Sequence, residues 1–145
     1  MFIGEYNHSV DSKGRVSLPA RFREDLSETF YITRGMENCL FIYDQEEWKL
    51  MDEKLRKLRL TAKAARGFSR LFYAGAMEIS CDKQGRFLIP NHLREFAGIE
   101  KDAVILGVST RIEVWSKDNW EAYLSGDAMN YDDLSAELDD LDLDL

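Results

Sequence analysis

The feature that most constrains the fold of this chain is an internal repeat. Residues 11–19 read Asp-Ser-Lys-Gly-Arg-Val-Ser-Leu-Pro, and residues 82–90 read Asp-Lys-Gln-Gly-Arg-Phe-Leu-Ile-Pro. Aspartate, glycine, arginine and proline therefore recur at the same spacing, with an offset of 71 residues. The match continues beyond each proline to an Arg-Glu pair, at residues 23–24 and 94–95. Two copies of one module fill most of the chain.

The length of the chain limits how independently the two copies can fold. The chain has 145 residues, of which 45% are hydrophobic, and this is enough for one substantial core. A module of about 70 residues would be marginally stable alone, so we expect the copies to share that core. We divide the chain into a first module core at 1–48, a basic helical connector at 49–72, a second module at 73–124 and an acidic tail at 125–145.

Local patterns predict the order strand, strand, short helix, strand, strand, helix in each module. Aspartate first and glycine fourth in each repeat turn favour a type I turn followed by a left-handed glycine, which is typical of a bulged hairpin. We therefore expect residues 6–10 to pair with residues 15–18. Proline after the second strand suits the first turn of a helix. Apolar spacing predicts two connecting helices, from Gln45 to about Leu60 and from Thr61 to about Phe72.

The charge of the chain is unevenly distributed. The formal net charge is −8, and the residues from Asp127 onward contain seven Asp, one Glu and no basic residue. The tail therefore accounts for the whole net charge, while residues 49–70 carry eight basic and two acidic side chains. Charge segregation of this kind leaves a polyanionic partner open, although the whole-chain value argues against one. Leucines near the end of the tail lack a sustained helical period, so we expect the tail to be partly disordered or to dock onto a partner.

Several classes of protein are disfavoured by the sequence. No apolar run approaches the roughly 20 residues that cross a bilayer, and the N-terminus lacks an export signal, so we expect a cytoplasmic protein without a membrane partner. The two Cys and two His residues lack metal-ligand spacing, and we predict neither a metal nor a cofactor. No nucleophile with an adjacent base and no phosphate-cradling loop is visible, so an enzyme is not expected. Trp48, Trp115 and Trp120 occupy apolar positions and are expected to pack in the interior.

The repeated turns carry the chemistry that most suggests a function. An arginine fork can hold two acceptors, such as O6 and N7 of guanine, while a lysine and turn amides can contact phosphates. The aspartate four residues earlier would orient the fork. A simpler interpretation makes each aspartate an ion-pair partner of its arginine, although an exposed pair of this kind adds little stability. Residue chemistry alone leaves both interpretations open.

The two Asp-x-x-x-Arg turns, each followed by a hydrophobic strand and proline, resemble those of the MraZ family of bacterial transcription regulators. The resemblance covers about residues 1–124, and it implies an α+β fold of two tandem AbrB-like swapped-hairpin modules that form a pseudo-symmetric β-barrel with flanking helices. It also implies a regulator of the division and cell-wall gene cluster, including its own operon. Such a protein binds double-stranded DNA at short G-rich direct repeats, associates with the nucleoid and forms a homo-oligomeric closed ring.

The resemblance also implies particular DNA-binding positions. The aspartate and arginine positions of both turns match the family pattern, and the lysine is matched only in the first turn, where Gln84 departs from it in the second. Arg21 and Arg23 are expected to pair with nearby glutamates and are the next candidates for phosphate contact. The candidate DNA-binding residues are Asp11, Lys13, Arg15, Arg21, Arg23, Asp82, Lys83 and Arg86.

A second class of function competes with DNA binding. In this alternative the chain forms a scaffold or interaction protein, its acidic tail recruits a partner, and the turn arginines hold subunits together. The two hypotheses differ in what happens when Arg15 is removed. Loss of DNA binding by an intact oligomer would support the regulator, and collapse of the oligomer would support the scaffold.

Overall fold

The computed structural model describes residues 1–126 and 130–141. The first module and connector contain β1 (Phe2–Ser9), β2 (Arg15–Ser17), α1 (Ala20–Asp25), β3 (Thr29–Arg34), β4 (Leu40–Tyr43), α2 (Gln45–Arg56) and α3 (Lys63–Gly75). The second module and tail contain β5 (Met77–Ser80), β6 (Arg86–Leu88), α4 (Asn91–Ala97), β7 (Asp102–Ser109), β8 (Arg111–Ser116), α5 (Lys117–Ser125), α6 (Tyr131–Glu137) and the 3-10 helix η2 (Leu138–Leu141). The predicted order of elements in each module is confirmed.

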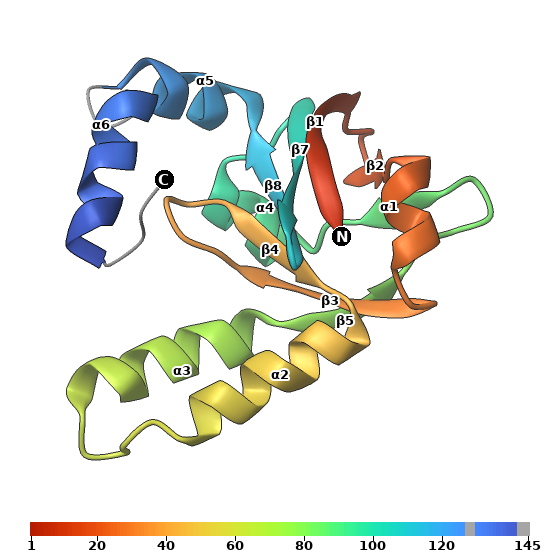
Figure 1. The fold of residues 1–145 in the computed structure, drawn as a ribbon. Helices are drawn as coiled ribbons and strands as arrows, with labels where there is room; N and C mark the ends of the chain where they lie inside the picture. Colours follow the sequence, from red (N-terminus) through yellow and green to blue (C-terminus); the bar gives the residue numbers. More distant parts are fainter. Residues whose placement is uncertain (127–129, 142–145) are drawn as a thin grey trace.

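The two modules exchange their strands (Figure 1). Six strands form one antiparallel sheet in the order β1-β7-β8-β4-β3-β5, and β2 pairs with β6 in a separate ribbon. Four of these pairings, β1 with β7, β4 with β8, β3 with β5 and β2 with β6, join one module to the other. Neither module therefore has a complete sheet of its own.

The predicted pairing of the first strand with the second is wrong, because the first strand has another partner. β1 pairs with β7 along its whole length, and only a single bridge between Val10 and Val16 connects the end of the first strand to β2. The turn reverses the chain as expected, but the strands on its two sides pair with different partners, β1 with β7 and β2 with β6. Alternation of apolar side chains sets which face of a strand is buried and leaves the choice of neighbouring strand open.

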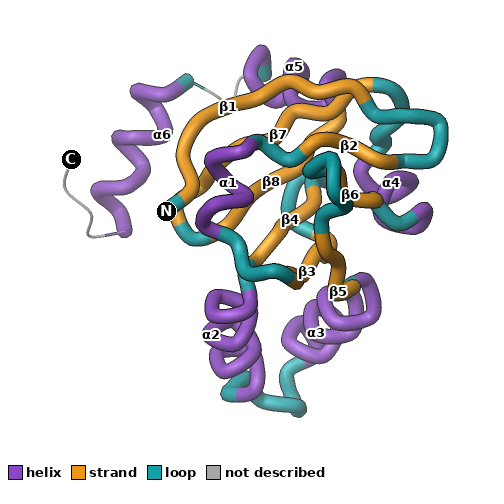
Figure 2. The backbone as a smooth tube through the Cα atoms, turned by 90° about the vertical axis from the view of Figure 1, so that its right-hand side faces the viewer, coloured by secondary structure: helices purple, strands orange, loops and turns teal. Residues whose placement is uncertain are grey.

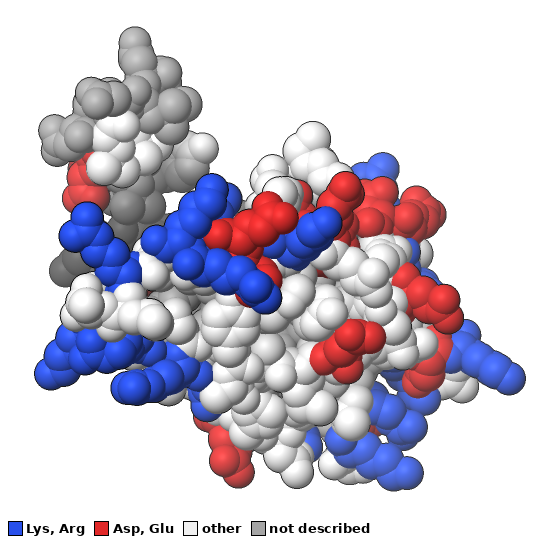
Figure 3. All heavy atoms as spheres, turned by 90° about the horizontal axis from the view of Figure 1, so that it is seen from below, with Lys and Arg blue, Asp and Glu red and all other residues white. Residues whose placement is uncertain are grey.

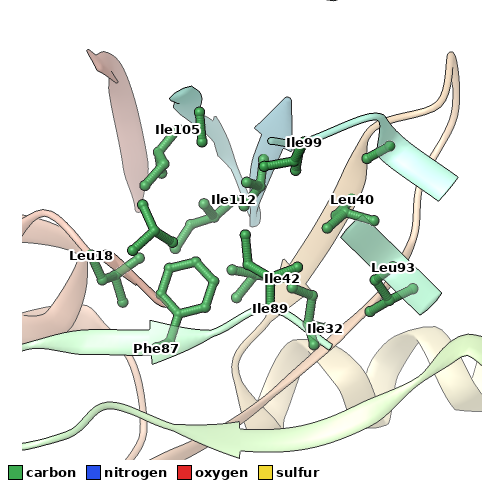
Figure 4. Packing of buried hydrophobic residues seen from close by; sticks show 14 of the residues in the cluster. Leu18, Ile32, Leu40, Ile42, Phe87, Ile89, Leu93, Ile99, Ile105 and Ile112 are labelled. Atoms are coloured by element: carbon green, nitrogen blue, oxygen red, sulfur yellow. The ribbon is translucent and has the colours of Figure 1, made fainter. Parts of the chain in front are cut away.

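A shared apolar core lies between the large sheet and the ribbon. Val16 from β2 and Phe87 from β6 are opposite one another in the ribbon, and each is 1% exposed. They pack with Ile42 from β4 and Ile112 from β8 in one cluster (Figure 4), to which α1 and α4 also contribute. The expectation that the modules share a core is confirmed.

The opposite face of the sheet is covered by the connector helices and α5. Along β4, Leu40 and Ile42 point to the shared core while Phe41 and Tyr43 enter a second cluster, because successive side chains of a strand alternate between faces. Trp48 of α2 belongs to this second cluster. Its ring stacks on Phe72 of α3 and on Tyr31 of β3, with ring centroids 5.3 and 4.6 Å apart.

The other two tryptophans also pack as expected. Trp115 is buried, and Trp120 and Tyr123 of α5 lie against its ring. All three tryptophans predicted to be interior are therefore in or against the second cluster.

The connector forms a helical hairpin that projects from the body (Figure 2). Asp44 caps α2 by accepting a hydrogen bond from the backbone amide of Glu47. The hairpin is attached to β3 by the Thr33 hydroxyl, which donates to the Phe72 carbonyl at 2.6 Å, and by Arg34, which donates to the Leu71 carbonyl. The sequence placed these two helices correctly, with shifts of a few residues at their ends.

The predicted α+β class is confirmed, while the closed barrel is not established. Among the described strands the six-stranded sheet has two ends, β1 and β5, and the ribbon is a separate ladder. In the acidic tail, residues 131–137 form α6, capped by the Asn130 side chain. Residues 127–129 and 142–145 lie outside the described part, so the expected disorder of the tail is not tested there. Within the described residues, no helix has both the length and the apolar character needed to span a bilayer.

The shared core predicts unequal effects at neighbouring positions of β6. Phe87→Ala is expected to lower the free energy of unfolding by about 3 to 5 kcal/mol, because it opens a cavity between the two modules. Leu88→Ala is the matched control, since Leu88 is on the outer face of the same strand and is 49% exposed. Its expected loss is below about 1 kcal/mol. Chemical denaturation measures both values, and equal losses would contradict a core built across the ribbon.

Candidate nucleic-acid interface

The first repeat turn is organised by one aspartate. Oδ1 of Asp11 accepts hydrogen bonds from the backbone amides of Lys13 and Arg15, at 3.0 and 2.9 Å. Its Oδ2 accepts from Nε of Arg15 at 2.8 Å. Gly14 has a φ of 89°, and its amide donates to the Asp11 carbonyl, which closes the turn. One carboxylate therefore shapes the backbone and orients the guanidinium at the same time.

The second turn repeats this geometry. Asp82 accepts from the backbone amides of Gln84 and Arg86, at 2.9 and 3.0 Å, and from Nε of Arg86 at 3.1 Å. Gly85 has a φ of 77°. The predicted left-handed glycine at the fourth position of a four-residue turn is confirmed in both copies, and its amide donates to the carbonyl of the first residue. Lys13 and Lys83 are exposed at the two turns.

Hydrogen bonds from the backbone lower the pKa of both carboxyl groups. The amide of Arg15 is the largest cause for Asp11, whose pKa falls to about 2, and the Arg15 side chain and the Lys13 amide add to it. The amide of Arg86 is the largest cause for Asp82, whose pKa also lies below its ordinary value. Both aspartates are therefore charged throughout the neutral range, and each holds its arginine as an ion pair.

The ribbon brings the two turns together. The amide of Leu18 donates to the carbonyl of Gly85, and the amide of Ile89 donates to the carbonyl of Gly14, both at 2.9 Å. Nη1 of Arg86 lies 3.8 Å from Oδ2 of Asp11, so the turns are also in contact through their side chains. Residues far apart in the chain thus form one continuous site.

Both arginines face outward on this ribbon. Arg15 is opposite Leu88 and Arg86 is opposite Ser17, while the pair between them, Val16 and Phe87, points into the core. The side chains of Arg15 and Arg86 are 35% and 29% exposed. Among the described residues, the hydrogen bonds of both guanidinium groups use Nε, while the terminal nitrogens make no hydrogen bond and Nη1 of Arg86 lies 3.8 Å from Oδ2 of Asp11. The ion pair with aspartate and the outward display of the fork therefore coexist.

Two further arginines, one on α1 and one on α4, pack against the turns. Arg23 of α1 donates from Nε to the Leu18 carbonyl at 3.1 Å, and its guanidinium lies against Gly85 of the other module. Arg94 of α4 makes the equivalent bond to the Ile89 carbonyl, and its guanidinium lies against Gly14. A side chain at either glycine would overlap these groups. Each turn is therefore braced by an arginine from the opposite module.

These contacts correct one expectation and add one residue. Glutamates were expected to pair with Arg21 and Arg23, but within the described part of the chain no carboxylate lies at ion-pair distance from either, and Arg23 bonds to a backbone carbonyl instead. Arg94 was not among the predicted site residues. The repeat itself carries the signal for it, because Arg94 occupies the position of Arg23 in the second copy. Arg21 is exposed on α1, outside the two turns.

The described residues offer little else that resembles a chemical centre. No group of three or more His, Cys, Asp or Glu side chains in them is placed to hold a metal ion. Fold and site together define a class: a two-repeat α+β protein whose modules exchange strands and display two Asp-Arg turns side by side. The sequence pattern described as "MraZ protein, putative antitoxin-like" matches residues 1–71 and 72–142, so the chain belongs to the MraZ family.

Similar proteins agree with this membership over nearly their whole length. A protein named "Transcriptional regulator MraZ" from Finegoldia magna is 54% identical over 143 residues, which cover 99% of this chain and 100% of the relative. Proteins of the same name from Caldanaerobacter subterraneus and Acetivibrio thermocellus are 52% and 54% identical. These matches cover 99% and 95% of this chain, and 100% and 96% of the relatives.

The close contact between Gly14 and Arg94 predicts that a methyl group added at Gly14 destabilises the fold. Gly14→Ala is expected to lower the free energy of unfolding by at least about 1 kcal/mol, because alanine is strained at positive φ and its Cβ overlaps Arg94. Gly67→Ala is the control, since Gly67 is in α3 with open space around it, and it is expected to stabilise by about 0.5 to 1 kcal/mol. Thermal or chemical unfolding measures both, and a neutral Gly14→Ala would contradict the brace.

The backbone origin of the Asp11 pKa is also testable. NMR titration of the Asp11 carboxyl group is expected to give a pKa of about 2, and Arg15→Ala should leave it well below the ordinary 3.8, since the amide remains. Because the folded-state pKa is lowered, the stability contributed by this carboxylate is complete above about pH 4 and is lost as the pH falls through about 2. Recovery of the ordinary pKa in Arg15→Ala would show that the side chain dominates.

Proposed function

We propose that this protein is a sequence-specific DNA-binding transcription regulator that uses the paired turns to contact double-stranded DNA. The observation that carries the proposal is the placement of Arg15 and Arg86 on the outer face of one ribbon, each oriented by its own aspartate. The relatives named as transcriptional regulators support the same function. The proposed targets are short G-rich direct repeats upstream of the division and cell-wall gene cluster, including the protein's own operon.

The geometry of the arginines suits the reading of guanine. A guanidinium whose Nε is held by a carboxylate still presents its terminal nitrogens, and these can donate to O6 and N7 of one base. A good bidentate contact discriminates by about 1 to 3 kcal/mol against the wrong base. Fixing the fork beforehand reduces the entropy lost on binding. The aspartates are therefore proposed as positioning groups and the arginines as the base-reading groups.

Phosphate contacts would come from the residues around the turns. Lys13 and Lys83 are exposed beside the arginines, and Arg21 is exposed on α1. Arg23 is mainly occupied by Leu18 and Gly85, so a role in positioning the second turn is favoured over direct contact. Contacts to phosphates fix the orientation of a protein on the duplex, while base contacts provide specificity.

One ribbon offers too little contact for tight specific binding, and this supports an oligomer. Two arginines and a few phosphate contacts are a small interface. Repetition of the ribbon around a closed homo-oligomeric ring would raise the effective concentration of each further contact. The same proposal includes the division at 1–48, 49–72, 73–124 and 125–145, closure of the AbrB-like swapped-hairpin modules into a pseudo-symmetric barrel, and a cytoplasmic location on the nucleoid. It includes no catalytic activity.

Arg15→Ala is the variant that tests the proposal. We expect it to weaken binding to duplex DNA from the region upstream of the protein's own gene by roughly 5-fold to 150-fold, equivalent to the loss of one bidentate base contact. Fluorescence anisotropy measures the affinity, and the slope of log affinity against log salt reports the phosphate contacts. The mass of the oligomer should not change.

Arg111→Ala is the matched control for this experiment. Arg111 has a similar side-chain exposure, 32%, and also pairs with a carboxylate, that of Glu113, but it lies at the start of β8, away from the ribbon. It should bind DNA as the unmodified protein does. Equal affinity for Arg15→Ala, or collapse of its oligomer, would instead favour the scaffold hypothesis.

A further inference from the structure

The far end of the α2–α3 hairpin carries an apolar groove with a basic rim. Its apolar lining comes from Leu55, Leu58, Leu60 and Ala65, and the four arginines of its rim are Arg56, Arg59, Arg66 and Arg70. Leu58 is 44% exposed and Leu60 is 82% exposed, which is unusual for leucines that lie together. Figure 3 shows basic side chains gathered on the side of the molecule where this hairpin ends. Exposed apolar side chains rimmed by polar ones are typical of surfaces that bind a partner.

The charge of this groove is largely uncompensated. Of the four rim arginines, only Arg56 has a carboxylate at ion-pair distance within residues 1–126 and 130–141, that of Asp52. Arg66 is partly occupied, since its Nη1 donates to the Leu60 carbonyl at 2.9 Å. Residues 49–70 as a whole carry eight basic and two acidic side chains. The groove therefore fits a partner that is both acidic and apolar.

The tail of the same chain has this chemistry. Tyr131, Leu134, Leu138 and Leu141 recur at spacings of three and four, so α6 and η2 present one apolar stripe. Tyr131 is 81% exposed and Leu141 is 73% exposed, and Figures 1 and 2 show α6 standing away from the sheet. Acidic residues accompany the stripe, with Asp133 and Glu137 along one flank. An amphipathic helix of this kind is stabilised when its stripe is buried.

We propose that α6 and η2 of one copy of this chain dock into the α2–α3 groove of a second copy. The apolar stripe of the tail helix would pack against the apolar lining of the groove. The acidic flank of the helix would lie against the arginine rim. A second copy is favoured over the same chain because α5 and the end of the hairpin lie on opposite sides of the molecule in Figures 1 and 2. Only residues 126–130 separate α5 from α6, and five residues span at most about 18 Å.

The geometry of this contact has a consequence for assembly. The surface used on one copy, the tail helix, differs from the surface used on the next, the groove. Contacts between unlike surfaces repeat from subunit to subunit, and they close into a ring or continue as a filament. The contact involves no residue of the Asp-Arg turns, so it can be tested independently of DNA binding.

A charge-exchange experiment on the full chain tests the proposal. The groove variant Arg59→Glu with Arg70→Glu reverses the charge at two rim positions, and the tail variant Asp133→Lys with Glu137→Lys reverses the charge of the flank that would face them. Arg66 and Arg56 are left unchanged because they bond within the hairpin. Each variant alone is expected to associate at least about tenfold more weakly than the unmodified chain, because like charges meet. Sedimentation velocity measures the association, and circular dichroism verifies that both variants fold.

Mixing the two variants distinguishes the possible occupants. In an equal mixture, positions 59 and 70 of every groove can meet a tail flank of opposite charge from the other variant, so association should recover if the contact joins two copies. Recovery only when all four substitutions are placed in one chain, with none on mixing, would mean that the tail binds its own groove and would overturn the proposal. Unchanged association of either variant alone would also overturn it.

Discussion

The pairing of β2 with β6 is the contact on which the rest of the structure depends. Both strands are three residues long, and neither could persist without a partner. Their pairing buries Val16 and Phe87 at the centre of the shared core and extends through the carbonyls of Gly14 and Gly85 into the turns. The core, the two turns and the outward arginines are thus consequences of one short ladder between the two copies.

The turns owe their shape to the backbone more than to surface charge. An exposed ion pair contributes little by itself, whereas a carboxylate that accepts two amides fixes the path of the chain. Asp11 does both, and its lowered pKa has the amide of Arg15 as its largest cause. The two interpretations that the sequence left open, a structural ion pair and a displayed arginine, therefore describe the same side chain.

Short sequence patterns predicted the features of this fold that depend on neighbouring residues. The left-handed glycines at 14 and 85, the helices after the prolines and the packing of Trp48 all follow from steric or apolar patterns within a few residues. The partner of each strand could not be predicted in this way, because β1 has the same alternation whether it pairs with β2 or with β7. The expected hairpins were wrong for this reason.

The role of Arg94 and the tail helix could not be predicted from short sequence patterns. The role of Arg94 against Gly14 depends on a contact between modules, and only comparison of the two copies points to it. The tail helix was missed because the closely spaced leucines after residue 140 obscured the stripe that begins at Tyr131. In the candidate site, the sequence identified the aspartates and arginines, but it could not show that strand exchange places them on one ribbon.

The duplication also gives the ribbon a polarity. A dimer of identical chains would offer the same groups on both sides of its symmetry axis, but here Lys13 of the first turn corresponds to Gln84 of the second, and Ser12 corresponds to Lys83. The two ends have diverged because they belong to one polypeptide and can mutate separately. Any rod-shaped molecule lying across both turns would therefore meet the lysine at a different position in each turn, and its two orientations would differ in energy.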